Sequence, residues 1–253
     1  MAAKEKRVLA MIFNIATYNI QHCKSYVHFK ETGEEILSPE RVSEVIRELG
    51  ADICALNEVY NQKMLDGGSD QAEKIADGLG YYHFFAKAID YKGFEYGNAL
   101  VSKFPIKAVK TVPIIVPENE RKKPHYENRV LLVAELDIEG KPFTVAVCHF
   151  GLSDEEKELA VSTVLSELGD IKTPLIFMGD LNLSPDTELI SKLQSELCDL
   201  SKQFGKEDPT FDSLAPYTKI DYIFAKGSLK AIDCEVVYAV FSDHLPVRAT
   251  IEI

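Results

Sequence analysis

Residues 174–182 read Pro-Leu-Ile-Phe-Met-Gly-Asp-Leu-Asn, an apolar run that ends in an acid and an amide. The apolar residues 175–178 predict a buried strand. In open α/β sheets, ligands bind beyond the carboxyl ends of strands, so Asp180 and Asn182 are the first candidates for chemistry. Alternation in an extended segment turns both side chains to one side, where they can hold a water between them. An Asx turn before Pro185 is the alternative.

The same arrangement occurs in the first half of the chain, where residues 52–58 read Asp-Ile-Cys-Ala-Leu-Asn-Glu. A predicted helix precedes each of the two strands. Ser38-Pro39 opens the first helix and Gly50 closes it. A capping box from Ser153 to Glu156 opens the second helix, which ends near Gly169. Helices that alternate with strands in both halves predict an α/β protein in which helices pack on sheets.

Runs of β-branched and apolar residues predict the remaining strands. The predicted strands are residues 13–20, 52–56, 98–102, 130–137, 143–150, 175–178, 220–225 and 247–253. Glu139-Gly140 predicts a hairpin turn between two of them. The segment from Pro113 to Tyr126 contains three prolines among charged residues, which predicts a surface loop rather than a helix or a central strand.

The composition is that of an ordinary globular protein, with 46% hydrophobic and 27% charged residues. Forty acidic and twenty-eight basic residues give a formal net charge of −12. This charge repels a polyanion at long range, so it disfavours nucleic acid as a partner. The five cysteines contain no Cys-x-x-Cys pair, which predicts buried, reduced thiols.

The N-terminal segment predicts a cytoplasmic protein. Residues 1–7 form a short, charged segment, and the apolar run 8–13 that follows ends at polar Asn14. We therefore expect neither the apolar core nor the small-residue cleavage site of a signal peptide. No apolar stretch approaches the roughly 20 residues that a membrane helix needs, and we expect no membrane partner. The sequence carries no signal for an oligomeric state.

Three further polar side chains interrupt or follow apolar runs. Asn19 can aim its amide at a phosphate or at a metal-bound water, and a turn-capping asparagine is the alternative. Glu58 is a carboxylate at a strand end; Mg²⁺ prefers oxygen ligands and needs only one or two such carboxylates, although solvated strand-end glutamates are common. His149 ends a fully apolar strand, where most histidines are core or rim residues.

The C-terminal region adds an acid–histidine pair. Asp243-His244 lies just before the last predicted strand and offers a metal ligand and a proton-transfer group in one place. Asp221 is the candidate acid that fixes the tautomer of this histidine. A surface turn capped before Pro246 is the alternative.

Together, the five segments supply the residue types that metal-assisted phosphoryl hydrolysis needs. No Gly-x-Ser-x-Gly elbow, Walker loop or dinucleotide glycine fingerprint offers another chemistry. The combined pattern therefore predicts a metal-dependent phosphoesterase.

In chain order, these segments resemble the endonuclease/exonuclease/phosphatase superfamily, of the deoxyribonuclease I type. The matching stretches are residues 18–20, 57–58, 97–106, 149, 179–182, 220–223 and 242–246. Because the match runs nearly end to end, the resemblance implies a single domain over residues 1–253 and a four-layer α/β/β/α sandwich.

The resemblance also implies the residues that hold the metal and the substrate. Glu58 binds a Mg²⁺ ion, with Mn²⁺ as an alternative ion, Asp243 lies beside it, and Asn19 helps to hold metal or phosphate. Asn19, Asn98 and Arg129 are the implied substrate contacts. For Arg129, a strand-end surface charge is the alternative.

The implied catalytic residues surround the attacking water. Asp180 activates this water and Asn182 orients it. His244 pairs with Asp221 and contacts the scissile phosphate, and His149 lies on the other side of that phosphate. Water then attacks a phosphodiester or phosphomonoester in line, without a covalent intermediate. His149 and His244 share the assignment of the group that assists the leaving oxygen.

Departures from the family pattern bear on the substrate. Abasic-site endonucleases usually carry a tyrosine and an Asn-Ala-Gly stretch where this chain has residues 147–151, and an acid where it has Gln21. These differences weaken a DNA-repair function. A nuclease is the alternative, with a basic surface made of Lys103, Lys107, Lys110, Arg121, Lys122 and Lys123. A catalytically silent binding module is disfavoured, because all the implied site residues are present.

Overall fold

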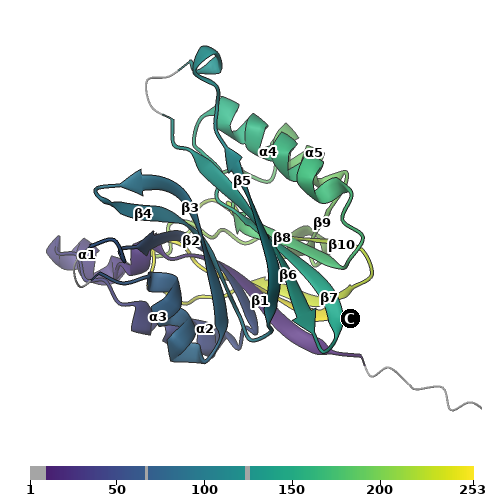
Figure 1. Ribbon diagram of the computed structural model, residues 1–253, viewed down its shortest axis with the longest axis horizontal. Coiled ribbons are helices and arrows are strands. Elements are labelled where there is room, and N and C mark those ends of the chain that lie inside the picture. Colours follow the sequence, from purple (N-terminus) through teal and green to yellow (C-terminus); the bar gives the residue numbers. More distant parts are fainter. Residues whose placement is uncertain (1–9, 66–67, 123–125) are drawn as a thin grey trace, which may run out of the picture.

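The computed structural model describes residues 10–65, 68–122 and 126–253. In this part of the chain, the strands form two six-stranded sheets. The sheets pack face to face, and helices cover their outer faces (Figure 1). This is the predicted four-layer α/β/β/α sandwich. The N-terminal residues 1–7, which we examined for a signal peptide, lie outside the described residues.

The first sheet contains most of the N-terminal half and the last two strands. Its order is β11 (Lys230–Val236), β12 (Val247–Glu252), β1 (Ile12–Asn19), β2 (Ile53–Asn61), β4 (Phe94–Ser102) and β3 (Tyr82–Tyr91). The neighbours β1 and β2 are parallel, so their carboxyl ends lie at the same edge.

The second sheet contains the middle of the chain. Its order is β5 (Ile106–Ile114), β6 (Arg129–Ile138), β7 (Lys141–Cys148), β8 (Leu175–Asp180), β10 (Asp221–Lys226) and β9 (Cys198–Asp199). The strands β7 and β8 are parallel, whereas β10 runs antiparallel to β8 and pairs Asp221 with Asp180. The predicted hairpin turn joins β6 to β7, and both Glu139 and Gly140 have positive φ.

Two of the described helices begin where the sequence predicts them, at Pro39 and at Asp154. The bounds are α1 (Tyr26–Thr32), α2 (Pro39–Leu49), α3 (Gln71–Leu79), α4 (Asp154–Gly169), α5 (Glu188–Gln194) and α6 (Leu200–Gln203), with 3₁₀ turns at Gln21–Cys23 and Glu118–Glu120. The Ser38 hydroxyl caps α2, and the predicted capping box of Ser153 and Glu156 opens α4. None of the described helices is both long and apolar enough to cross a membrane.

Three apolar layers hold the sandwich together. The central layer lies between the sheets and includes Ile15, Leu132 and Met178. A second layer packs α2 and α3 on the first sheet, and a third packs α4 and α5 on the second. The strands β1, β2 and β8 are largely buried on both faces, so polar side chains at their ends are shielded from bulk water.

The eight predicted strands correspond to the interior strands of the two sheets. The four strands that the sequence did not predict, β3, β5, β9 and β11, are the four sheet edges. Edge strands carry less apolar surface, so the pattern that predicts strands is weak in them. The predicted loop from Pro113 to Tyr126 begins two residues later in the structure, because Pro113 and Ile114 still belong to β5. Pro113 is tolerated there because an edge strand has positions that need no N–H.

Candidate active site

The predicted site residues come together at one end of the sandwich, where β1 and β8 end and β10 begins. Asn19 is the last residue of β1, Asp180 is the last residue of β8, and Asp221 is the first residue of β10. His149 directly follows β7, and Asp243-His244 precedes β12. Both sheets therefore contribute side chains to the same site.

Glu58 reaches the site through a β-bulge. We expected β2 to end near Leu56, but it continues to Asn61. The pairing with β4 shifts register between Leu56 and Val59, so that Asn57 and Glu58 lie opposite a single residue. Glu58 adopts a φ of 59°, in the left-handed region. A bulge re-aims side chains in this way and is frequent next to active sites.

The Asn19 amide links Glu58 to Asp180. Its Nδ2 donates to Glu58 Oε1 and to Asp180 Oδ2, both at 3.0 Å. Its Oδ1 accepts from the backbone N–H of Gln21 at 3.1 Å. Asn19 is fully buried, so its orientation is fixed by these contacts. The two carboxylates consequently keep a defined separation across the two sheets.

Asp180 lies between two histidines. Its Oδ2 is 3.5 Å from His149 Nε2 and 3.6 Å from His244 Nε2. Burial of the carboxyl group raises the pKa of Asp180 to about 7, although the charge of His244 opposes this. A carboxylate with a pKa near neutrality can both accept and release a proton at physiological pH.

His244 forms the predicted pair with Asp221. Its Nδ1 is 2.9 Å from Asp221 Oδ2, and both side chains are buried. Burial alone disfavours the charged imidazole, but the Asp221 and Asp180 carboxylates outweigh it and raise the pKa of His244 to about 10. His244 is therefore a cation at neutral pH, with a proton on the nitrogen that faces Asp180.

His149 has the opposite protonation state. Burial and the positive charges of Arg129 and His244 hold the pKa of His149 well below its usual value, so the ring is neutral. Arg129 Nη1 lies 3.3 Å from His149 Nδ1, and a guanidinium can only donate. A proton on Nε2, the atom that faces Asp180, satisfies this contact, although Asn182 Nδ2 lies 3.2 Å from the same nitrogen and is also a donor. The buried Arg129 is anchored by Glu127 at 2.6 Å.

Asn182 lies beside Asp180, but for a different reason from the one predicted. It has left the extended strand and adopts a φ of 50°, a conformation that asparagine tolerates better than most residues. Its backbone N–H donates to Asp180 Oδ1 at 3.0 Å, which is the Asx turn that we considered as the alternative. Its Nδ2 donates to the Phe150 carbonyl at 3.1 Å and lies 3.2 Å from His149 Nε2.

The Asn98 side chain is occupied by internal contacts. Its Oδ1 accepts from Asn57 Nδ2 at 2.8 Å, and its Nδ2 donates to the Val130 carbonyl at 3.0 Å. Asn57, which the sequence analysis did not single out, also accepts from the backbone N–H of Asp180 at 2.9 Å. The signal that could have identified Asn57 is an amide in a strand that is otherwise buried on both faces.

Gln21 is a second residue that the sequence analysis missed as a site component. Its Nε2 donates to Asp243 Oδ2 at 2.6 Å, whereas its Oε1 is buried without a hydrogen-bond partner among the described residues. Gln21, His22 and Cys23 all have positive φ. With Glu58 and Asn182, they make up five of the seven described non-glycine residues with positive φ, and backbone strain of this kind concentrates at functional sites.

The oxygen atoms around Glu58 and Asp243 fit a hard divalent cation. Burial raises the pKa of both carboxyl groups, and the negative charge of Asp243 raises the pKa of Glu58 further. The unpartnered Oε1 of Gln21 adds a neutral oxygen beside Asp243. Carboxylate and amide oxygens are the ligands that Mg²⁺ prefers, and a cation here would compensate two buried negative charges.

Asp180, Asp221 and His244 form a second group of candidate ligand atoms, all within 4.8 Å of one another. A metal ligand must be a neutral imidazole with a free nitrogen. In His244, Nδ1 is bound to Asp221 and the ring is protonated. Both ring nitrogens of His244 thus face a carboxylate, Asp221 at 2.9 Å and Asp180 at 3.6 Å.

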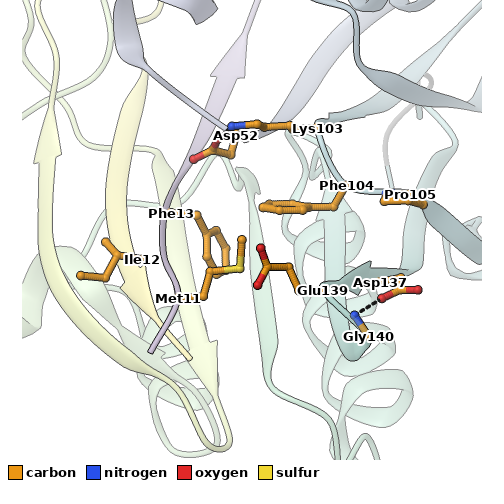
Figure 2. A pocket seen from close by; sticks show the side chains of 10 residues that line it. All are labelled: Met11, Ile12, Phe13, Asp52, Lys103, Phe104, Pro105, Asp137, Glu139 and Gly140. Atoms are coloured by element: carbon orange, nitrogen blue, oxygen red, sulfur yellow. Dashed lines mark hydrogen bonds and ion pairs between the residues drawn. The ribbon is translucent and has the colours of Figure 1, made fainter. Parts of the chain in front are cut away.

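An open pocket of about 550 Å³ lies at the opposite end of the sandwich (Figure 2). It is lined by the start of β1, at Met11 to Phe13, whereas Asn19 ends the same strand about 20 Å away. In this pocket, Lys103 forms an ion pair with Asp52 at 3.0 Å. None of the predicted site residues lines it.

Comparison with solved structures supports the fold. The chain is similar to an endonuclease/exonuclease/phosphatase protein from Beutenbergia cavernae, with a TM-score of 0.79 and 21% identity over 96% of this chain and 72% of that one. It is also similar to a mannosyl-6-phosphatase from Bacteroides thetaiotaomicron (TM-score 0.72, 16% identity, 94% of this chain and 99% of that one). A third similar structure is TDP2 from C. elegans (TM-score 0.67, 17% identity, 96% of this chain and 76% of that one).

Two sequence comparisons bear on the family. The chain is 27% identical over 155 residues to the protein cwh43 of Schizosaccharomyces pombe, a match that covers 60% of this chain but only 15% of that much longer protein. The model of the Endonuclease/Exonuclease/phosphatase family matches residues 16–244, a span that includes every predicted site residue. The chain therefore belongs to the endonuclease/exonuclease/phosphatase family, whose members are phosphoesterase hydrolases.

Proposed function

We propose that this chain is a Mg²⁺-dependent phosphoesterase that hydrolyses a phosphomonoester or phosphodiester by direct attack of water. The observation that carries the proposal is the Asn19 amide, which bonds both Glu58 and Asp180 at 3.0 Å. It places a metal-binding carboxylate beside a carboxylate with a pKa near 7. The named relatives with this fold include a phosphatase, which agrees with the chemistry.

Glu58 and Asp243 would hold the metal ion, with the Gln21 amide oxygen as a further ligand. When bound, the ion neutralises charge on the phosphate and polarises its oxygens. Asp180 takes the proton of the attacking water. Its position is fixed by Asn19 on Oδ2 and by the Asn182 backbone N–H on Oδ1, so it cannot rotate away from the water.

The two histidines stabilise the phosphate from opposite sides of Asp180. His244 contributes a positive charge, which Asp221 holds in place through Nδ1. His149 contributes a neutral ring, whose Nδ1 lies 3.3 Å from Arg129 Nη1. Of the two, only the protonated His244 can release a proton to the leaving oxygen near neutral pH, so we assign it that role.

The test is metal-dependent hydrolysis of a panel of phosphate esters by the wild type and Asp180→Asn. The panel contains aryl mono- and diesters, sugar phosphates, glycerol phosphate, RNA and abasic DNA. We expect Mg²⁺-dependent turnover that is abolished by EDTA and lowered about 10²- to 10⁴-fold in kcat by the substitution. Equal rates for the variant and the wild type would rule out Asp180 as the base.

Most residues of the basic surface that the nuclease alternative needs are paired with carboxylates. Four of the six form ion pairs, Lys103 with Asp52, Lys107 with Asp137, Lys110 with Glu167 and Lys122 with Glu155. Arg121 Nε donates instead to the Val116 carbonyl. Lys123 lies outside the described residues. Lysines neutralised in this way release few counterions from a nucleic acid, so they contribute little to its binding.

A further inference from the structure

A cluster of five aromatic rings lies beside the candidate site. It consists of His22, Tyr60, Tyr91, Phe94 and Tyr96, and we call it the aromatic cluster. Tyr60 is at its centre, with ring centroids 4.5 Å from His22, 4.4 Å from Phe94 and 5.7 Å from Tyr96. The rings come from the turn after β1, from β2 and from the β3–β4 hairpin, so three segments converge to form it.

The aromatic cluster begins next to the proposed metal ligand. Tyr60 follows Glu58 by two residues on β2, a rise of about 7 Å, and pairs across the strands with Tyr96. Burial raises the pKa of Tyr96, the negative charge of Glu58 raises it further, and the positive charge of Arg129 opposes them. Asn98, two residues further along β4, donates to the Val130 carbonyl at 3.0 Å, so Tyr96 lies near the start of β6 and its Arg129.

Ring surface in the aromatic cluster stays accessible. Tyr60 is buried, but His22, Phe94 and Tyr96 are only half-buried, and Tyr91 at the outer edge is 37% exposed. The Lys92 ammonium lies 5.0 Å from the Tyr91 ring centroid, so this outer ring faces a cation. Accessible ring surface of this kind beside a candidate site is a feature of ligand-binding surfaces rather than of ordinary exteriors.

Polar groups lie on the other side of Arg129. A pocket of about 300 Å³ is lined by Tyr126, Glu127, Arg129, Leu152 and Glu156. Glu127 is 44% exposed while it anchors Arg129, so one edge of its carboxylate can still accept hydrogen bonds from a ligand. Glu127 is the carboxylate that this pocket leaves open to a ligand, because Glu156 is buried and its oxygens already accept from Ser153 and from the Glu127 backbone N–H. Such a carboxylate repels a second phosphate but accepts well from hydroxyl groups.

These two surfaces together select the organic part of the substrate. The aromatic cluster offers faces for C–H-rich rings, and the pocket offers the Glu127 carboxylate as an acceptor for hydroxyls. A polynucleotide would bring further phosphates toward Glu127 and Glu156, whereas a neutral ring with several hydroxyls satisfies both surfaces. A ring attached through one ester oxygen to a phosphate at Glu58 would fall within the distance of about 7 Å that separates Glu58 from Tyr60.

We propose that the aromatic cluster and the Glu127–Arg129 pocket form a subsite for the ring of a cyclic polyol, so that the substrate is a sugar-type phosphate ester. This inference rests on the proposed phosphoesterase function and adds the class of the organic group. The ring stacks on Phe94 and Tyr96, and its hydroxyls donate to Glu127. The phosphate meanwhile lies between Glu58 and the two histidines.

The test measures binding, so that it does not depend on turnover. In the Asp180→Asn background with Mg²⁺, calorimetry gives the affinity for a hexose 6-phosphate, for glycerol 1-phosphate and for a 5′-phosphorylated trinucleotide, which carries further phosphates. Phe94→Ala is compared with Tyr82→Ala, which removes a ring that is 53% exposed at the far end of β3. Circular dichroism verifies that both variants are folded.

We expect the hexose phosphate to bind more tightly than the acyclic phosphate. Phe94→Ala should lower that preference about tenfold, the effect of losing one ring-stacking contact, and Tyr82→Ala should preserve it. Glu127→Gln provides a second variant, which should also lower the preference.

Three results would overturn the subsite. They are equal affinities for the cyclic and acyclic phosphates, equal effects of the two aromatic substitutions, and tighter binding of the trinucleotide than of the hexose phosphate. Absence of metal-dependent hydrolysis by the wild type on every ester would instead overturn the proposed function. The binding measurements would still decide on the subsite, so the two failures are distinguishable.

Discussion

Asn57 joins the two sheets at the candidate site. Its Oδ1 accepts from the Asp180 backbone N–H at 2.9 Å, and its Nδ2 donates to Asn98 at 2.8 Å and to the Cys148 carbonyl at 3.3 Å. All four residues are buried. A buried polar group that loses its partner retains the full cost of desolvation, so this single amide has a large effect on stability.

We expect Asn57→Ala to lower the free energy of unfolding by about 2–4 kcal/mol, because it leaves several buried groups without partners. Asn61→Ala, on the same strand, loses a side-chain contact with Glu95 in a partly buried position and should cost less than about 1 kcal/mol. Urea unfolding followed by circular dichroism compares the two. Similar losses in both variants would contradict the linking role of Asn57.

Sequence reasoning identified the site carboxylates and histidines because each follows an apolar run. Asp180 and His149 are examples, and the structure brings them within 3.5 Å of each other. Sequence reasoning did not identify Gln21 or Asn57 as site components, because the role of an amide depends on partners that are distant in the sequence. Asn57, for example, meets Asp180 across 123 positions. The left-handed backbone at Glu58 and Asn182 could not be predicted from a sequence pattern either, because it arises from a bulge and a turn.

At the level of elements, β8 requires a glycine, Gly179, directly before Asp180. A Cβ at Gly179 would lie 1.9 Å from the Cys148 carbonyl oxygen of the neighbouring strand, and φ is 149°. Close approach of β7 and β8 therefore depends on the absence of a side chain. This contact sets the separation of His149 and Asp180, which follow these two residues directly.

We expect Gly179→Ala to cost at least about 3 kcal/mol of stability, because the clash is with backbone that cannot move without disrupting the sheet. Gly169→Ala is the matched control. It lies at the end of α4 with no atom within 4 Å of the added Cβ, and it should be neutral or stabilise the protein by up to about 1 kcal/mol. Thermal unfolding of both variants checks this, and a stable Gly179→Ala protein would contradict it.

The elements that sequence reasoning missed share one property, namely their position at sheet edges. In β5, for instance, exposed and half-buried residues alternate irregularly, and three lysine or threonine side chains near its centre hide the apolar pattern. Interior strands such as β8 are buried throughout and give a continuous apolar run. Edge strands take their conformation from the neighbouring strand, and this pairing is not encoded in their own composition.

For the whole molecule, a net charge of −12 combined with paired lysines predicts weak binding of nucleic acid. We expect fluorescence anisotropy to show no binding of a single-stranded oligonucleotide tighter than about 100 µM at physiological salt, the weak end of non-specific affinities. Affinity in the micromolar range that falls steeply with salt would favour the nuclease instead.

In the proposed mechanism, Glu58 and Asp243 bind the metal ion, whereas Asp180, Asp221 and His244 handle protons. The most direct test is calorimetric titration of Mg²⁺ into the wild type, Glu58→Gln and Asp221→Asn, with turnover measured on the same preparations. We predict that Glu58→Gln weakens Mg²⁺ binding at least about tenfold and abolishes turnover, because the ion loses its carboxylate ligand. Asp221→Asn should bind Mg²⁺ normally while kcat falls by about 10²-fold or more. Loss of Mg²⁺ binding in Asp221→Asn with retention in Glu58→Gln would contradict this assignment and place the ion in the other group.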